Sequence, residues 1–229
     1  MKRNFWFSYI ALVVIGLVFT GLAFADTELA EKKTIFYEGP GNQSAEAVKL
    51  AEEHLYAIGV ATRSGSELFG VVYKLPLENV PNARFSWKDD QKSAVKVTSV
   101  FSDLTITDEG LYVVGSSLSA MSGKKKSEYR SGVLAKFPLN AAGAVTPLWI
   151  VHTDFYPQEK DEVFRAVTTV KEQNSIVVYA TGYAAAGHDN LTAILAKYDS
   201  KGQLMWSKIL SSENKMNNSA GTSVLILNN

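Results

Sequence analysis

Short apolar runs separated by polar turn residues recur along this chain, and their length and composition predict β-strands. Three runs carry a tyrosine and end on a glycine: 55–59, 111–115 and 178–182. Three others end on a lysine: 70–74, 132–136 and 193–197. A third set is marked by tryptophans: Trp87, Trp149 and Trp206. Because the landmarks recur in the same order, they indicate an internal repeat of three units.

Each unit is predicted to contain four strands. A further apolar stretch precedes each glycine run, at 45–50, 100–106 and 163–170. These segments are rich in Val, Ile, Tyr, Phe and Thr, the residues that favour extended backbone. In the third unit, Asp199 and Gly202 are spaced for a hairpin turn, in which aspartate accepts backbone hydrogen bonds and glycine adopts a positive φ.

Repeated four-stranded antiparallel units are typical of β-propellers, whose blades take roughly 40 to 50 residues. The sequence therefore predicts an all-β fold, a β-propeller-like array of about three four-stranded antiparallel blades plus partial terminal strands. The expected units are 45–92, 93–160 and 161–212, with partial strands at 33–39 and 222–227. An array too short to close a ring leaves strand edges open, so we expect self-association through open blade edges.

The N-terminus has the layout of a secretory signal. Lys2 and Arg3 precede an uncharged apolar stretch, 5–25, which ends in small residues that suit signal peptidase. This pattern predicts a cleaved signal peptide at 1–25 and a mature domain at 26–229. The alternative is an uncleaved membrane anchor, because about 20 apolar residues can span a bilayer. Contact with a membrane is expected only if this segment stays uncleaved.

Composition narrows the class of protein and its location. The chain has 229 residues, 23 basic and 23 acidic, and no cysteine. A balanced charge lacks the basic excess of nucleic-acid-binding proteins, so no nucleic-acid partner is expected. Together with the signal, this composition predicts an exported protein that is periplasmic, extracellular or attached to the cell surface.

The third unit resembles the repeat of secreted bacterial β-propeller families, the seven-bladed β-propeller repeat and quinoprotein-like blades. Its runs 178–182 and 197–206 follow the pattern apolar-Tyr-x-x-Gly and then Lys-x-Asp-x-x-Gly-x-x-x-Trp. The first two units keep the lysine and tryptophan but lack the Asp-x-x-Gly turn. The resemblance covers about residues 33–226, and it implies the architecture of a truncated member without implying an activity.

Few residues point to catalysis or to a cofactor. The histidines His54, His152 and His188 do not have the spacing of a metal site, and neither a serine nucleophile elbow nor a phosphate loop is present. The recurring tryptophans are predicted to pack between sheets, and the recurring lysines to keep their ammonium groups in water. We therefore assign no catalytic, cofactor-binding or metal-binding residue and expect no cofactor.

One charge cluster is a candidate partner-contact loop. It lies at 121–130, and its candidate residues are Lys124, Lys125, Lys126, Tyr129 and Arg130. Basic side chains on a loop between two strands could contact an anionic partner. A plain solvated insertion is the alternative interpretation.

These observations favour an exported, non-catalytic β-propeller module that binds an unknown protein or glycan ligand through its loops and central face. The alternative is a fragment of a propeller enzyme, a quinoprotein-like oxidoreductase or a glycan-active enzyme, whose catalytic residues lie outside this chain. Because one propeller architecture hosts many functions, the predicted fold does not decide between them.

Overall fold

The computed structural model describes residues 43–51, 54–62, 68–76, 99–118, 130–139, 147–153, 155, 161–185, 191–210 and 219–226. These residues form strands and contain no helix, so the predicted all-β class is confirmed. In particular, they include no helix long and apolar enough to cross a membrane. The predicted signal at 1–25, the partial strand at 33–39 and the region of Trp87 lie outside the described residues.

The strands form three antiparallel sheets, each built from consecutive strands. The first sheet contains β1 (Gln43–Ala51), β2 (His54–Thr62) and β3 (Leu68–Pro76). The second contains β4 (Ser99–Thr107), β5 (Gly110–Leu118), β6 (Arg130–Phe137) and β7 (Trp149–His152). The third contains β8 (Glu162–Glu172), β9 (Ser175–Ala185), β10 (Leu191–Asp199) and β11 (Leu204–Leu210). The second and third sheets have the four strands predicted for a unit, whereas the first sheet has three in the part of the chain that the structure describes.

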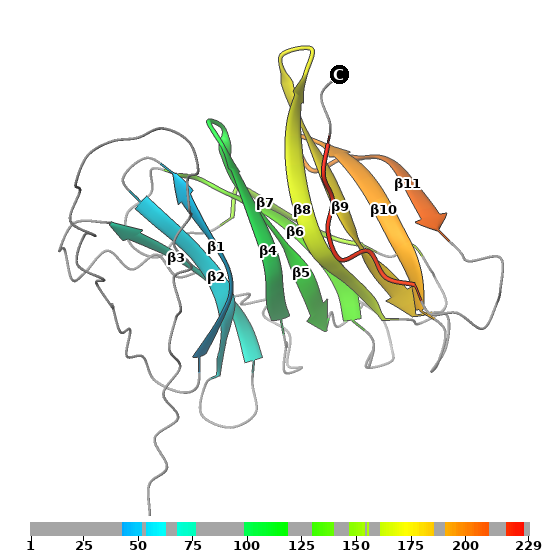
Figure 1. The fold of residues 1–229 in the computed structure, drawn as a ribbon, viewed down its shortest axis with the longest axis horizontal. Coiled ribbons are helices and arrows are strands. Elements are labelled where there is room, and N and C mark those ends of the chain that lie inside the picture. Colours follow the sequence, from blue (N-terminus) through cyan, green and yellow to red (C-terminus); the bar gives the residue numbers. More distant parts are fainter. Residues whose placement is uncertain are drawn as a thin grey trace, which may run out of the picture.

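The three sheets stack face to face along the long axis of the molecule (Figure 1). One apolar cluster lies between the first and second sheets and includes Ile58, Val72, Phe101 and Leu104. A second cluster, which includes Phe164, lies between the second and third sheets. The second sheet is therefore covered on both faces, and the sheets do not close into a ring.

The recurring glycines stand opposite β-bulges. Gly59, Gly115 and Gly182 are paired across the sheet with Ala45, Phe101 and Phe164, and at each of these partners the register of the preceding strand shifts by one residue. A Cβ at any of the three glycines would overlap a backbone carbonyl oxygen of that preceding strand. Glycine therefore recurs because a bulged strand passes too close for a side chain.

A second set of glycines makes room for phenylalanine between sheets. Gly70 in β3 faces the Phe101 ring of the second sheet, and a Cβ there would lie 2.7 Å from that ring. Gly132 in β6 faces the Phe164 ring of the third sheet in the same way, at 3.2 Å. The two interfaces between sheets are thus built alike, because a missing side chain on one sheet receives a large one from the next.

The turn chemistry predicted for the third unit is confirmed. Asp199 Oδ1 accepts hydrogen bonds from the backbone N–H groups of Lys201 and Gln203, at 2.9 and 2.8 Å. Gly202 has a φ of +81°, the left-handed region that favours glycine. The aspartate and the glycine together close the hairpin between β10 and β11.

The C-terminal segment differs from the strand predicted at 222–227. Residues 219–226 run beside the third sheet without joining a ladder (Figure 1, red). Two backbone hydrogen bonds hold the segment, from Ser219 N to Leu191 O and from Gly221 N to Gly182 O. Both acceptors belong to strands that already have neighbours on each side, so this segment has no strand edge to extend.

Candidate functional site

A tyrosine, a lysine and a tryptophan stand directly opposite one another on neighbouring strands of the second and third sheets. Cross-strand partners share one face of a sheet, so each trio forms a continuous row. The rows are Tyr112, Lys136 and Trp149 in the second sheet, and Tyr179, Lys197 and Trp206 in the third. We call them the second-sheet row and the third-sheet row.

The two rows have nearly identical geometry. Lys136 Nζ lies 5.0 Å from the centroid of the Tyr112 ring, and Lys197 Nζ lies 5.4 Å from that of Tyr179. The tyrosine and tryptophan ring centroids are 6.0 Å apart in both rows. The lysine stem therefore lies along the aromatic pair while its ammonium group interacts with the tyrosine ring.

A glutamate completes each row. Lys136 Nζ contacts Glu109 Oε2 at 3.1 Å, and Lys197 Nζ contacts Glu172 Oε2 at 2.9 Å. In the first sheet, Lys74 Nζ also lies over a tyrosine ring, but it donates its hydrogen bond to Leu139 O at 2.7 Å. The strand-end lysines thus have defined partners in all three sheets, and the prediction that their ammonium groups stay in water is wrong for Lys136, which is buried.

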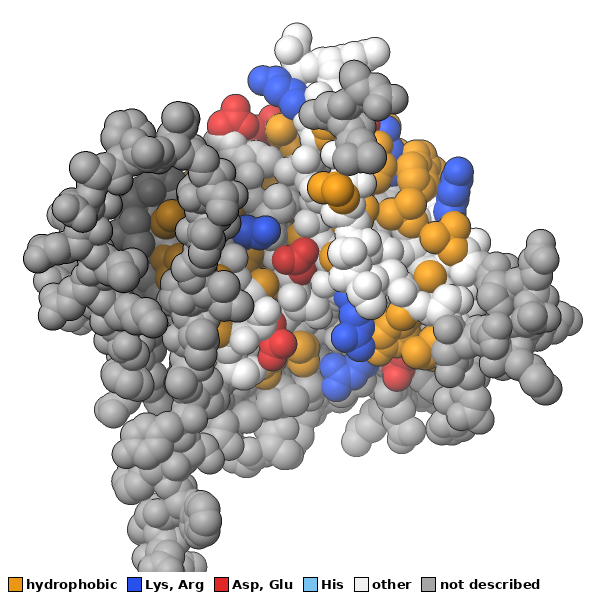
Figure 2. Space-filling model, viewed as in Figure 1, with side chains coloured by type: hydrophobic (Ala, Val, Ile, Leu, Met, Phe, Trp, Pro, Cys, Tyr) orange, Lys and Arg blue, Asp and Glu red, His pale blue; other side chains and the backbone are white. Residues whose placement is uncertain are grey.

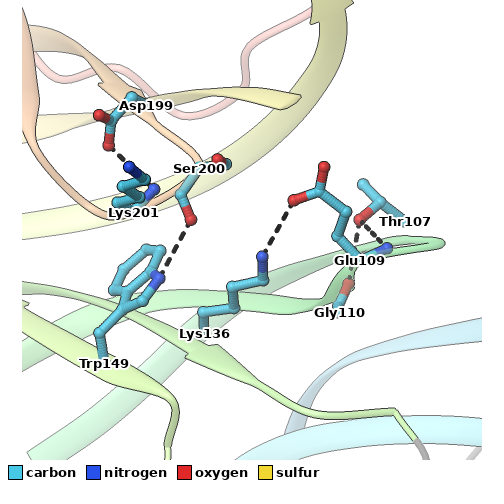
Figure 3. Close-up of polar contacts among 8 residues, drawn as sticks. All are labelled: Thr107, Glu109, Gly110, Lys136, Trp149, Asp199, Ser200 and Lys201. Carbon is cyan, nitrogen blue, oxygen red and sulfur yellow. Dashed lines mark hydrogen bonds and ion pairs between the residues drawn. The ribbon is translucent and has the colours of Figure 1, made fainter. Parts of the chain in front are cut away.

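The hairpin between β10 and β11 covers the second-sheet row. Trp149 Nε1 donates a hydrogen bond to Ser200 O at 3.1 Å, and the indole ring packs against Gly202 (Figure 3). Tyr112 is fully buried in the cluster between the second and third sheets. This agrees with the prediction that Trp149 packs between sheets.

The third-sheet row points away from the second sheet. Val178, Ala196 and Tyr198, which alternate with its members along β9 and β10, lie in the cluster between the second and third sheets. Side chains alternate faces along a strand, so Tyr179 and Lys197 lie on the opposite face. Their row is only partly buried there, with 14% of the Lys197 side chain exposed against 9% for Lys136. No further described sheet covers this row, so the prediction that Trp206 packs between sheets is wrong, and we call the row the open counterpart of the second-sheet row.

Exposed apolar side chains lie along β11 on both faces of the third sheet. Leu204 and Ile209 pair with residues of the cluster between the second and third sheets, whereas Leu210 shares the face of the row. Four residues of β11, the strand that carries Trp206, are between 45% and 54% exposed: Leu204, Met205, Ile209 and Leu210. Figure 2 shows apolar and basic side chains together on the surface over the third sheet. An exposed apolar group of this kind marks a contact surface more often than isolated surface residues do.

Hydrogen bonding shifts the pKa values within the third-sheet row. Lys197 Nζ and Tyr179 Oη each donate to the Glu172 carboxylate at 2.9 Å. These bonds, that of Lys197 first, lower the pKa of Glu172 below its usual value, and the same contact with Glu172 raises the pKa of Lys197. The row is thus an ionised pair at neutral pH.

Burial has a larger part in the second-sheet row. Burial raises the pKa of Tyr112. It works against the charged form of Lys136, but the neighbouring Tyr112 hydroxyl and Glu109 carboxylate outweigh it, so the pKa of Lys136 is raised. Both rows therefore hold a charged lysine, one beneath a covering sheet and the other on an open face.

Other ionisable side chains join the sheets to one another. Glu162 is buried and accepts hydrogen bonds from Thr153 Oγ1 at 3.0 Å and Phe155 N at 2.6 Å. Asp103 Oδ2 in β4 accepts a hydrogen bond from Val167 N in β8 at 2.9 Å. Burial, followed by the charge of Glu162, raises the pKa of Tyr198. These contacts give the carboxylates a structural role between the second and third sheets.

The predicted partner-contact loop is described at a single residue. Lys124, Lys125, Lys126 and Tyr129 lie outside the described residues. Arg130 begins β6, where its backbone N–H donates to Asp161 Oδ1 at 2.7 Å and its Nη1 lies 3.4 Å from Ser116 Oγ. Arg130 thus links β6 to β5 and to the residue before β8, and its role in a partner contact stays a prediction.

The histidines are dispersed where they can be placed. His54 begins β2 and His152 ends β7, while His188 lies outside the described residues. Among the residues that the structure describes, no group of His, Asp and Glu side chains is arranged to hold a metal ion.

The glutamates of the two rows, Glu109 and Glu172, were not predicted from the sequence. Glu109 lies in the tight turn after β4, whereas Glu172 is the last residue of β8, so they stand at different distances from their tyrosines along the chain. No fixed spacing marks them in the sequence. Only the pairing of strands brings both to the same end of the row.

A Glu172→Gln variant is expected to flatten the acid limb of the stability–pH curve. Because the folded-state pKa is lowered, the contribution of Glu172 is fully present above its ordinary pKa of 4.5 and is lost as pH falls through the folded value. The contribution of Lys197 fades only in alkali, since its pKa is raised above 10.5. Denaturant unfolding across acid pH measures the effect. Tyr179→Phe should behave as an intermediate, and an unchanged acid limb in Glu172→Gln would contradict the assignment.

Comparison with known proteins does not identify a family. No protein-family model matches the sequence, and no curated protein is significantly similar to it. The inference of function therefore depends on the geometry of the two rows.

Proposed function

We propose that this chain is an exported, non-catalytic module with a β-propeller-like arrangement of blades, which binds a protein partner through the third-sheet row. The observation that carries the proposal is that one side-chain arrangement occurs twice, once covered and once open. The covered copy packs against a protein hairpin, and the open copy has the same rings, lysine and glutamate.

The covered row indicates the chemistry of the partner. Trp149 needs a backbone carbonyl for its indole N–H and a residue without a side chain against its ring, and Ser200 and Gly202 provide them. A partner on the third-sheet row would present an equivalent hairpin to Trp206. A sugar ring could stack on an exposed indole, but Tyr179 already contacts the Trp206 ring and Lys208 Nζ lies 5.5 Å from it. A protein hairpin is therefore favoured over a glycan.

The roles of the ionisable groups support a binding module over an enzyme. Both lysines of the rows form ion pairs with glutamates, and Glu162 and Asp103 hold neighbouring sheets together. A catalytic group needs access to a substrate and a protonation state suited to proton transfer. Paired and inter-sheet groups of this kind serve packing, which is the role we assign to them.

Partner binding can be tested with the exported proteins of the source organism. Proteins retained by the wild-type chain, then purified singly, should raise its unfolding temperature as the concentration of the partner rises. Trp206→Ala should lose at least tenfold in affinity, whereas Trp149→Phe, a change beneath the covering hairpin, should bind as the wild type does. Binding that is indifferent to Trp206→Ala would overturn the proposal. Stabilisation by glycans alone, or a cofactor spectrum in the purified chain, would favour the enzyme or glycan alternatives.

A further inference from the structure

The strand β11 lies at the end of the third sheet, with β10 on one side and no further described strand on the other. It is seven residues long, and every residue but Trp206 is exposed. The corresponding strand of the second sheet, β7, is four residues long and half-buried throughout. An exposed apolar edge strand of this length is a template for pairing with another strand.

The sequence of β11 is complementary to itself in antiparallel order. With two copies related by a two-fold axis at Ser207, each Trp206 faces the Lys208 of the other copy. Beyond these residues the bulge at Met205 turns Leu204 to the face of Tyr198, whereas Leu210 shares the face of Trp206, so the matched positions are 206–208. Each tryptophan thus meets a cation across the two-fold axis, a pairing that stabilises strands across a sheet.

Neighbouring registers lack this complementarity. A two-fold axis at Lys208 places two ammonium groups directly opposite each other, which is destabilising. An axis at Trp206 places Lys208 opposite Leu204. The axis at Ser207 pairs each Trp206 with a lysine and brings the smallest side chain to the centre.

We propose that two copies of this chain associate through antiparallel pairing of β11 with β11 about a two-fold axis at Ser207, joining their third sheets into one. The ladder between β10 and β11 is regular from Trp206 to Leu210, with a bulge at Met205, so the central residues keep the extended geometry that pairing needs. The contact is isologous, the commonest kind in homodimers. It uses the edge of the sheet, where Trp206 is the one member of the third-sheet row that takes part, and leaves Tyr179 and Lys197 on the face of the sheet.

Charge substitution at Ser207 tests both the dimer and its register. Analytical ultracentrifugation of the purified wild-type chain should show a dimer that dissociates on dilution. Ser207→Lys and Ser207→Glu should each weaken the dimer at least tenfold, since like charges then meet on the axis, and a one-to-one mixture of the two variants should restore it. Ser175, an exposed serine at the start of β9, provides matched controls, because Ser175→Lys and Ser175→Glu should leave the dimer unchanged.

A single cysteine gives a second measurement that does not depend on charge. The chain has no cysteine, so Ser207→Cys carries the only thiol. A short bismaleimide should crosslink this variant into covalent dimers, whereas Ser175→Cys should stay monomeric under the same conditions. The proposal is overturned by a wild-type chain that is monomeric at every concentration. It is also overturned if the single charge variants still dimerise, or if their mixture fails to regain the dimer.

Discussion

Replacing Gly182 with alanine is expected to lower the free energy of unfolding by about 3 kcal/mol, the upper part of the range for forced overpacking. The new Cβ would overlap the carbonyl oxygen of Val163 and come within 2.8 Å of Phe164 Cα. Both are backbone atoms of the bulged strand β8, so no side-chain rotation can relieve the contact. Gly115→Ala in the second sheet should have a similar effect, because it meets Val100 and Phe101 in the same way.

Denaturant unfolding monitored by circular dichroism measures this difference. Thr181→Ser is the matched control, because it changes the neighbouring position in β9 and keeps a hydroxyl that can donate to Ile194 O. That variant should lose no more than about 1 kcal/mol, the scale of one methylene group. If Gly182→Ala unfolds at the same denaturant concentration as Thr181→Ser, the bulge is not the reason for the recurring glycine.

Replacing Trp149 with alanine should cost about 3 kcal/mol, the lower end of the range for a large aromatic side chain, because the indole is only partly buried. The substitution removes the ring between Tyr112 and Gly202 and the hydrogen bond to Ser200 O. It thereby weakens the packing contact between the second and third sheets. Trp149 and Trp206 occupy the same position in their units, which suggests equal contributions to stability. Trp149, however, packs against a neighbouring sheet, whereas Trp206 contacts residues of its own sheet.

Trp206→Ala provides the comparison. Its ring contacts Tyr179 and Lys208 within its own sheet, and no hydrogen bond from its indole N–H to another described residue is seen. We expect a loss of about 1 kcal/mol, close to the value for a surface aromatic pair. Thermal or denaturant unfolding of the two variants side by side should separate them clearly. Equal losses would mean that the third-sheet row is covered in solution.

Most strands, their order and one turn could be predicted from local patterns in the sequence. Periodic apolar runs, a glycine in each unit and the Asp199–Gly202 turn are local signals, since each depends on residues a few positions apart. These signals predicted a strand at each of β1 to β11, and they also predicted one at 222–227, where the structure has none over 222–226. The lysine and tryptophan landmarks were also visible, because their positions in each unit repeat.

The contacts of the recurring tyrosines, lysines and tryptophans depend on how the strands pair and how the sheets stack. Tyr112, Lys136 and Trp149 belong to three strands, and strand register alone makes them neighbours. Glu109 and Glu172 stand at unequal distances along the chain from their tyrosines, so their shared role has no sequence signature. The stacking of the sheets makes the two rows differ in burial. The third sheet covers the second-sheet row, while the third-sheet row faces outward. Burial depends on what packs against a face, and a local pattern does not contain that information.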